Sequence, residues 1–369
     1  MNPIRVLHVV TYMGRGGLET MIMNYYRHID RSKVQFDFLV HRDFRADYDD
    51  EIESMGGMIY RFPKLVPWSR KYNAALDQFF AAHSEYRIVH VHQDCLSSVI
   101  LKAAQRHGVP VRIAHSHNNN QEKNLKYLIK LYYMRQIPGS ATDLFACGRD
   151  AGDWMFGGAP YRILNNAIDA QKYVFSPEIR NQMRRDLQID ENTLVVGNVG
   201  RFYSQKNHTF LLDIFAELKR IRPNTLLLLV GEGPLREELQ TKAKALGIND
   251  SVIFTGVRSD IHALMQAMDV FVFPSLFEGL PVALIEAQAA GLPCLISSSI
   301  PTECRKTNLI TPIPLTRSPA EWAGEVLQKA GMVHENMLPQ IQKSGFDIRE
   351  NAVFLQNFYL ERYALQSSE

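Results

Sequence analysis

The sequence is poor in cysteine and has no long apolar run. Its four cysteines form no C-x-x-C pair and no pattern of a secreted disulfide framework, so we expect reduced thiols in the cytosol. No apolar stretch approaches the ~20 residues that are needed to span a bilayer. The start, MNPIRVLHVV, lacks the long apolar segment and the cleavage site of a signal peptide and is typical of a first strand. These absences predict a cytoplasmic protein.

Strong net charge is also missing. The formal charge of +2 is too small to argue for a nucleic-acid partner. Basic residues gather in two segments: residues 61–72, which also hold Trp68 and Tyr72, and residues 121–136, where Lys123, Lys126 and Lys130 flank an apolar helical face. Such a helix either packs its apolar face into the core or lies on the anionic inner leaflet of a membrane as a peripheral contact. Both interpretations stay open.

Each half of the chain alternates short apolar strands with helical segments, which is typical of parallel sheets covered on both faces. Strands are expected at 4–10, 35–40, 58–62, 88–92, 110–117, 143–148, 193–200, 225–233, 251–256, 269–275 and 292–297. Helices are expected near 17–29, 70–84, 95–107, 121–136, 207–221, 234–246, 259–268, 282–290 and 346–365. We therefore predict an α/β protein of two doubly wound, Rossmann-like domains. Ligands should bind beyond the carboxyl ends of the strands.

The length of 369 residues suits two domains of ~150 residues each. We place the first domain at residues 1–167, since turn residues follow it, and the second at residues 168–345. Residues 346–369 form a closing helix.

The segment FEGLPVALIEAQAAG, residues 277–291, is the most informative in the chain. Glu278 follows a buried strand, and a helix of strong helix formers begins near Val282, with Glu286 inside its first two turns. The free N–H groups of Gly279, Leu280 and Val282 would point out of the helix start and form an anion site. Two carboxylates around a phosphate site predict a ligand that carries hydroxyls and phosphate, such as a nucleotide sugar.

Two cations, Arg201 and Lys206, lie in GRFYSQKN, the loop that follows the first strand of the second domain. Position at a strand end favours the neutralisation of a departing diphosphate, which Arg can bind bidentately. A pair of ordinary surface cations is the alternative interpretation.

Three further loops carry weaker signals. In MGRGGLET, Gly16 and Gly17 would let the backbone approach a ligand, but the segment lacks the third glycine of the dinucleotide-binding fingerprint. Glu232 in VGEGPLREEL either borders the ligand or belongs to a structural turn. In TGVRSDI, Val257 and Arg258 lie in a loop that could read a base edge, with Ser259 or Asp260 as a helix cap.

Histidines end two strands of the first domain. In RIAHSHNNN, the strand-end position favours His117 for the ligand crevice, and Asn118 could orient it; a structural histidine is the alternative. His90 and His92 show the same alternation, and their role stays open. The D-x-D of Asp47 and Asp49 is interpreted as a solvated helix start and not as a metal site.

Together these motifs resemble the retaining glycosyltransferases of family 4, which have the GT-B fold with two Rossmann-like domains facing a central cleft. The resemblance covers roughly residues 1–300. The segments RIAHSHNNN and LNNAID look like those of bacterial exopolysaccharide and capsule enzymes. One departure is Asn166-Ala167, where the family usually shows Asn-Gly. The resemblance implies a cytoplasmic hexosyl- or N-acetylhexosaminyl-transferase that takes its sugar from a nucleotide donor, most often UDP-linked. The acceptor would be a glycan or a lipid-linked sugar, recognised by the first domain.

The resemblance also implies roles for single residues. Arg201 and Lys206 would hold the diphosphate in place of a metal ion, and His117 would contact the sugar near the reacting carbon. Glu278 would hold the sugar and Glu286 the ribose, while the other donor contacts would come from Gly16, Gly17, Glu232, Val257, Arg258, Gly279, Leu280, Pro281 and Val282. Closure of the two domains would exclude water.

Two other classes remain open. A nucleotide-sugar epimerase or hydrolase of the same fold would consume donor without an acceptor. A non-catalytic glycan-binding partner would bind no nucleotide diphosphate.

Overall fold

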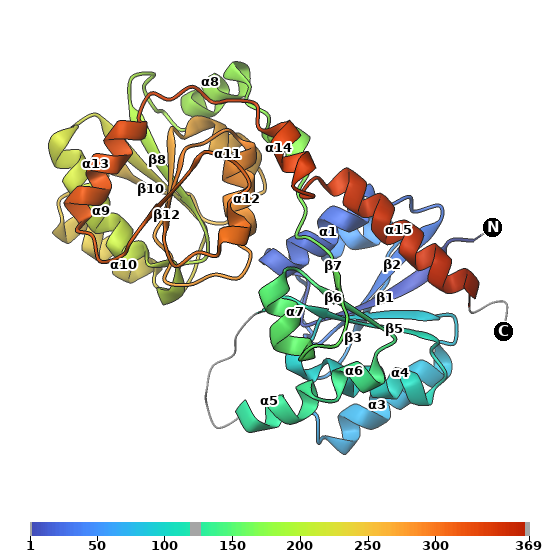
Figure 1. Cartoon of the computed structure of the whole chain (residues 1–369). Helices are drawn as coiled ribbons and strands as arrows, with labels where there is room; N and C mark the ends of the chain where they lie inside the picture. The colour runs from blue at the N-terminus through green and yellow to red at the C-terminus, as the bar shows by residue number, and fades with distance from the viewer. Residues whose placement is uncertain (1, 119–126, 366–369) are drawn as a thin grey trace. The chain divides into compact units, whose positions relative to one another are not determined.

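The computed structural model describes residues 2–118 and 127–365. It divides into two compact units, one made of Met1–Ala167 with Ile348–Glu369 and the other of Ile168–Asp347 (Figure 1). The chain thus changes unit after residue 167 and again after residue 347, two residues later than the closing segment expected from residue 346.

The first unit is a seven-stranded sheet in the order β3-β2-β1-β4-β5-β6-β7, with every neighbouring pair parallel. Its strands are β1 (Ile4–Val10), β2 (Val34–Val40), β3 (Ile59–Arg61), β4 (Ile88–Val91), β5 (Val111–Ser116), β6 (Asp143–Ala146) and β7 (Arg162–Ile163). Its helices are α1 (Gly17–His28), α2 (Asp49–Ser54), α3 (Arg70–Ala82), α4 (Ser97–Arg106), α5 (Tyr127–Met134), α6 (Ile137–Ser140), α7 (Arg149–Phe156) and α15 (Ile348–Leu365). Helices α1 and α15 cover one face and α3 and α4 the other (Figure 1).

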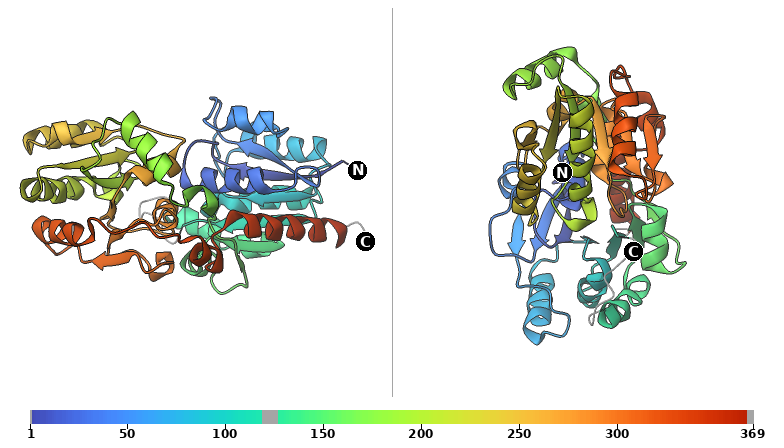
Figure 2. Two further views of the ribbon diagram at one scale, coloured as in Figure 1. Left: turned by 90° about the horizontal axis from the view of Figure 1, so that it is seen from above. Right: turned by 90° about the vertical axis from the view of Figure 1, so that its left-hand side faces the viewer.

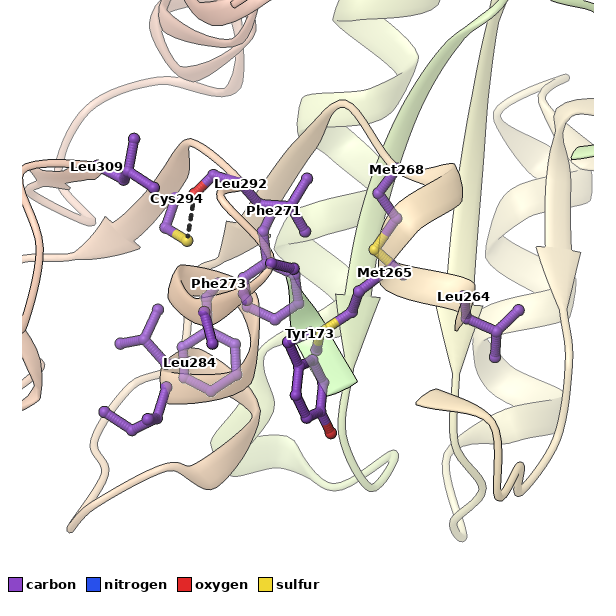
Figure 3. Packing of buried hydrophobic residues seen from close by; sticks show 14 of the residues in the cluster. Tyr173, Leu264, Met265, Met268, Phe271, Phe273, Leu284, Leu292, Cys294 and Leu309 are labelled. Atoms are coloured by element: carbon purple, nitrogen blue, oxygen red, sulfur yellow. Dashed lines mark hydrogen bonds between the residues drawn. The ribbon is translucent and has the colours of Figure 1, made fainter. Parts of the chain in front are cut away.

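The second unit is a six-stranded parallel sheet in the order β10-β9-β8-β11-β12-β13. Its strands are β8 (Leu194–Val199), β9 (Thr225–Val230), β10 (Val252–Phe254), β11 (Val270–Phe273), β12 (Cys294–Ser297) and β13 (Ile310–Ile313). Its helices are α8 (Pro177–Asp186), α9 (His208–Ile221), α10 (Arg236–Ala245), α11 (Ile261–Ala267), α12 (Val282–Ala289), α13 (Pro319–Lys329) and α14 (Leu338–Lys343). On one face Phe271 and Phe273 of β11 pack with Met265, Met268 and Leu284 (Figure 3).

The order of each sheet reverses once, and this decides where ligands can bind. In the first unit the chain runs outward from β1 on one side and from β4 on the other; in the second unit the same reversal lies between β8 and β11. All strands are parallel, so their carboxyl ends share one edge, and the loops after the two central strands diverge there. Such a switch point is the usual ligand site of an open α/β sheet.

The predicted doubly wound α/β class is confirmed, and every strand expected from the sequence is present. The strands that were not expected lie at the sheet edges: β7 has two residues, and β13 contains Pro312, which suits an edge strand. The helices that were not expected include α8, of 10 residues, and α13, of 11 residues. The terminal helix α15 packs on α1 in the first unit, burying Leu355, Phe358 and Tyr359 (Figures 1 and 2).

The Asn166-Ala167 departure needs no glycine. Among the described residues, the non-glycine positions with positive φ are Asp94, Gln188 and Asn207, so Ala167 has an ordinary backbone conformation. Its N–H donates to the carbonyl of Asn165 at 2.7 Å, and its side chain is buried.

Candidate active site

The loops that follow β8 and β11 meet at the switch point of the second unit. Lys206 Nζ lies 2.6 Å from Glu278 Oε1, and the two side chains are 19% and 6% exposed. Lys206 Nζ also lies 5.0 Å from the centre of the Phe273 ring, at the end of β11. Lys206 and Glu278, both predicted as site residues, therefore form an ion pair with each other. A lysine has three donors, so two remain for a ligand.

Backbone and amide contacts hold the two loops together around this pair. The Gln205 carbonyl accepts from the N–H of Leu276 at 2.8 Å, and its side-chain amide donates to the Phe277 carbonyl at 2.9 Å. Asn207 Nδ2 donates to the Pro274 carbonyl at 3.1 Å. Asn207 has φ +55, a conformation that Asn tolerates better than most residues. Sequence reasoning missed Gln205 and Asn207; their polarity on either side of Lys206 was the available signal.

Arg201 lies at the start of the same loop and is exposed. No ion pair or hydrogen bond joins its guanidinium to another residue in the part of the chain that the structure describes. An unpaired cation beyond a central strand is available to an anionic ligand, which supports the predicted role.

The glycines of VGEG have a structural function that the sequence did not reveal. Gly231 has φ +140, and a Cβ there would overlap the carbonyl oxygen of Gly200. A Cβ on Gly233 would lie 2.6 Å from the Phe202 carbonyl oxygen. The turn after β9 therefore packs directly on the loop that carries Arg201. Glu232 pairs with Arg236 one helical turn on, which favours the structural interpretation of this residue.

Glu286 is half-buried in the second turn of α12. The Tyr173 hydroxyl donates to its Oε1 at 2.6 Å, and burial raises the pKa of the carboxyl despite that bond. Tyr173 precedes α8 by only a few residues and gave no sequence signal. Its predicted contact with ribose stays a prediction.

Helix α12 begins as expected, with Pro281 as N-cap and Val282 as its first residue. The N–H groups of Gly279, Leu280 and Val282 donate to no other described residue, so they are available at the helix start. The helix ends before Gly291, which has φ +72.

The predicted cap of α11 is correct in position but lacks the capping bond. Asp260 occupies the N-cap position of α11, but its side chain makes no cap bond; it binds Arg258 through two hydrogen bonds of 2.8 and 2.6 Å. The charged pair has displaced the capping bond. Val257 in the same loop is 54% exposed, and its predicted contact with a base stays a prediction.

In the first unit, α1 begins at Gly17 with Gly16 as N-cap. A Cβ on Gly17 would meet nothing within 4 Å, so packing in the unit does not demand glycine there. The D-x-D was predicted to be a solvated helix start: the helix start is confirmed, because Asp49 is the first residue of α2, but the solvation is wrong for Asp49, which is buried. Asp49 pairs with Arg61, and Asp47 accepts from the N–H of Arg15 at 3.2 Å.

His117 lies just after β5, as expected, but Asn118 does not orient it. Asn118 donates to Asp94 at 2.9 Å, whereas the partner of His117 Nε2 is His92 Nδ1, at 2.9 Å. Burial lowers the pKa of His117 to about 3, so the imidazole is neutral. The open question about His92 is thus answered in part: it positions His117. The predicted contact of His117 with a sugar stays a prediction.

Known protein families match both units of the chain. The family described as Glycosyltransferase Family 4 matches residues 15–172, and that described as Glycosyl transferases group 1 matches residues 179–305. The chain is 37% identical to EpsF of Bacillus subtilis (strain 168), described as a glycosyltransferase, over 96% of both chains. It is 26% identical to the UDP-Gal:alpha-D-GlcNAc-diphosphoundecaprenol alpha-1,3-galactosyltransferase of Escherichia coli over 61% of each.

Among solved structures, Anabaena HepE in complex with UDP and glucose superimposes with a TM-score of 0.78 at 19% identity. The match covers 97% of this chain and 100% of HepE. That likeness concerns the fold. With the whole-length similarity to EpsF and the two domain matches, it shows that the chain belongs to glycosyltransferase family 4 and has the GT-B fold.

Proposed function

We propose that this glycosyltransferase moves a hexosyl or N-acetylhexosaminyl group from a UDP-sugar to a glycan or lipid-linked acceptor in cell-surface polysaccharide synthesis, with retention of the anomeric configuration. The observation that carries the donor proposal is the Lys206–Glu278 pair at the β8/β11 switch point, with unpaired Arg201 in the same loop. A cationic loop beside an open helix start matches the two phosphates of such a donor.

In the proposed reaction, the bond from the sugar to the diphosphate breaks and negative charge gathers on the leaving phosphate. Arg201 and the free donors of Lys206 lie where they could stabilise that charge, and so could the N–H groups that open α12. Each preorganised group of this kind is worth ~3 kcal/mol, or about a hundredfold in rate. We propose that these groups replace a metal ion at the diphosphate. The donor phosphate would help to take the proton of the acceptor hydroxyl.

The two glutamates serve different parts of the donor in this proposal. Glu278 is held in place by Lys206 and would accept hydroxyl protons of the sugar. Glu286 keeps the Tyr173 bond and would face the ribose hydroxyls. This division excludes the acid–base pair that two carboxylates often form in glycosidases.

The donor class is tested by thermal shift with UDP-, GDP- and ADP-sugars. Stabilisation by UDP-sugars alone is expected; with free ligand at 100 times its Kd, the unfolding free energy rises by about 2.7 kcal/mol. The site variant Arg201→Ala removes an exposed unpaired cation and should weaken the shift without unfolding the protein. No shift with any nucleotide diphosphate would support a non-catalytic protein. Turnover of donor without an acceptor would support a hydrolase or epimerase.

The acceptor proposal rests on the Escherichia coli relative, which is named for a sugar carried by diphosphoundecaprenol. It also rests on helix α5. The described residues of its predicted apolar face, Leu128, Ile129 and Tyr132, are exposed, so the interpretation that this face lies in the core is wrong, although Tyr133 and Met134 pack partly against the core. Leu128 is 75% and Tyr132 64% exposed, and no residue of α5 is buried. Lys123 and Lys126 lie outside the described residues. Across 2–118 and 127–365, no helix is long and apolar enough to span a bilayer.

We therefore expect α5 to bind the anionic inner leaflet of a membrane. Replacing Lys123, Lys126 and Lys130 by Gln should weaken binding to vesicles with anionic lipid by about a hundredfold, because each basic residue near such a surface contributes about 1 kcal/mol. Sedimentation with vesicles measures this. The matched control replaces Lys172, Lys244 and Lys343, three lysines of the second unit. Equal binding of both variants would remove the membrane proposal.

A further inference from the structure

Five histidines gather on one face of the first sheet. His8 comes from β1, His90 and His92 from the end of β4, and His115 and His117 from the end of β5. The alternation of HVH and HSH places both members of each pair on the same face of the sheet. His8 and His90 are register partners on neighbouring strands. A group of neutral imidazoles is thus concentrated at the β1/β4 switch point.

The hydrogen bonds among these imidazoles leave some ring nitrogens without a partner. His8 Nδ1 lies 3.1 Å from His92 Nε2, and His92 Nδ1 lies 2.9 Å from His117 Nε2. A neutral imidazole has one N–H and one bare nitrogen, so a chain of three leaves one of each at its ends. The end atoms, His8 Nε2 and His117 Nδ1, are buried without a partner among the described residues.

A second series of hydrogen-bonded side chains also ends in an unpaired ring nitrogen. The Tyr359 hydroxyl lies 2.6 Å from His90 Nδ1, and His90 Nε2 lies 3.2 Å from His115 Nδ1. His115 is fully buried, and its Nε2 has no partner among the described residues. An unpaired buried polar atom costs about 1–3 kcal/mol. A bound ion or another polar ligand in this cluster would satisfy such atoms.

The geometry of three of these rings fits one metal ion. Imidazoles on a tetrahedral ion at metal–nitrogen distances of 2.0–2.1 Å have ring centres about 5 Å apart and bound nitrogens about 3.3 Å apart. The ring centre of His92 lies 5.1 Å from the ring centre of His117 and 5.2 Å from that of His115. His115 and His117 are closer, at 4.0 Å, and must open by about 1 Å. One candidate ligand atom from each of the three lies within 4.8 Å of the other two.

Accessibility selects this trio over the other one. His8, His90 and His92 are also close enough to share an ion, but His8 packs against Phe36 and Phe38 inside the sheet. Of the five histidines, His117 is partly exposed and the other four are buried, so the trio of His92, His115 and His117 lies nearer to solvent than the trio that contains His8.

We propose that His92, His115 and His117 form a binding site for one divalent transition-metal ion of the zinc class. Imidazole ligands suit Zn²⁺, Co²⁺ and Ni²⁺, and the absence of a carboxylate from the trio disfavours Mg²⁺ and Ca²⁺. The site lies in the first unit, whereas the residues proposed to hold the donor diphosphate lie in the second. It is separate from the residues proposed to neutralise the diphosphate, although it includes His117, for which a contact with the sugar is predicted.

The test uses full-length protein without a histidine tag, stripped with EDTA and titrated with CoCl₂ and then ZnCl₂. One Co²⁺ per chain should bind and give the strong visible absorption of tetrahedral cobalt, and Zn²⁺ should displace it; Mg²⁺ should have no effect. His117→Asn, at a half-exposed position, should weaken Zn²⁺ binding by at least about a hundredfold, the upper limit for loss of a mere outer-shell partner. His115→Asn should do the same.

The matched control is His107→Asn, which removes a histidine of the first unit that pairs with Asp77 outside the trio. It should bind Co²⁺ like the unaltered protein. If His115→Asn does not fold, His117→Asn decides alone, with its thermal unfolding measured without metal to show that it folds. No cobalt absorption, or unchanged binding in folded His117→Asn, overturns the proposal. Neither result bears on donor binding, which is measured separately.

Discussion

Lys206→Ala is expected to lower sugar transfer by about a hundredfold or more, because it removes a preorganised cation from the site where leaving-group charge develops. It also removes the partner of Glu278, whose side chain is 6% exposed. The reaction should therefore lose rate at saturating donor, seen as a fall in kcat, since the cation is needed most in the transition state.

The same substitution leaves a buried carboxylate unpaired, so the unfolding free energy should fall by about 1–3 kcal/mol. The double variant Lys206→Ala/Glu278→Gln separates the two effects. It replaces the carboxylate with a neutral amide, so stability should return in part while transfer stays low.

Lys242→Ala is the matched control. Lys242 lies in the same unit, pairs with Asp213 at 2.7 Å and is 26% exposed, close to the 19% of Lys206, but it lies outside the two site loops. Its loss should leave kcat unchanged. Turnover of Lys206→Ala at the rate of the unaltered enzyme would show that the proposed donor site is wrong.

Gly231→Ala should have the second large effect, on stability. The new Cβ would overlap the Gly200 carbonyl oxygen, and neither backbone segment can move without disturbing the sheet. The φ of +140 adds strain for any L side chain. We expect a loss of about 3 kcal/mol or more in unfolding free energy, measured by urea unfolding of the whole chain. Arg201 follows Gly200, so donor binding should weaken as well.

Gly247→Ala isolates the backbone part of this effect. Gly247 has φ +67, but a Cβ there would meet nothing within 4 Å. Its substitution should cost only the conformational strain, about 1 kcal/mol. Equal losses at the two positions would show that the close approach of Gly231 to Gly200 contributes nothing.

Short apolar strands and the segments that follow them were readable from sequence because their signals are local. DVFVFPS predicted β11 and placed Glu278 in the next loop, and the helix formers from Val282 to the glycine at 291 predicted α12. The unexpected β7 and β13 are edge strands of two and four residues. Their pairing depends on a neighbour already in place and leaves a weak pattern in the chain.

Partners at the site were predicted less well, because they come from distant parts of the chain. The Lys206 and Glu278 loops were placed in one crevice, but their direct ion pair required the strand order that sets β8 beside β11. Tyr173 reaches Glu286 across 113 positions, and His92 displaces Asn118 as the partner of His117. At Asp260, by contrast, the partner is close in sequence: a helix-capping bond was expected, and the carboxylate pairs with Arg258 instead.

The sequence by itself determined the alternation of strands and helices, the position of Arg201, Lys206, Glu278 and Glu286 at element ends, and the kind of ligand these residues suit. Backbone propensity and apolar periodicity are properties of neighbouring residues, so no fold is needed to read them. Only the tertiary structure decided which side chains meet. Parallel strands carry residues from opposite ends of a unit to one edge, and this turned five separate histidines into one buried cluster.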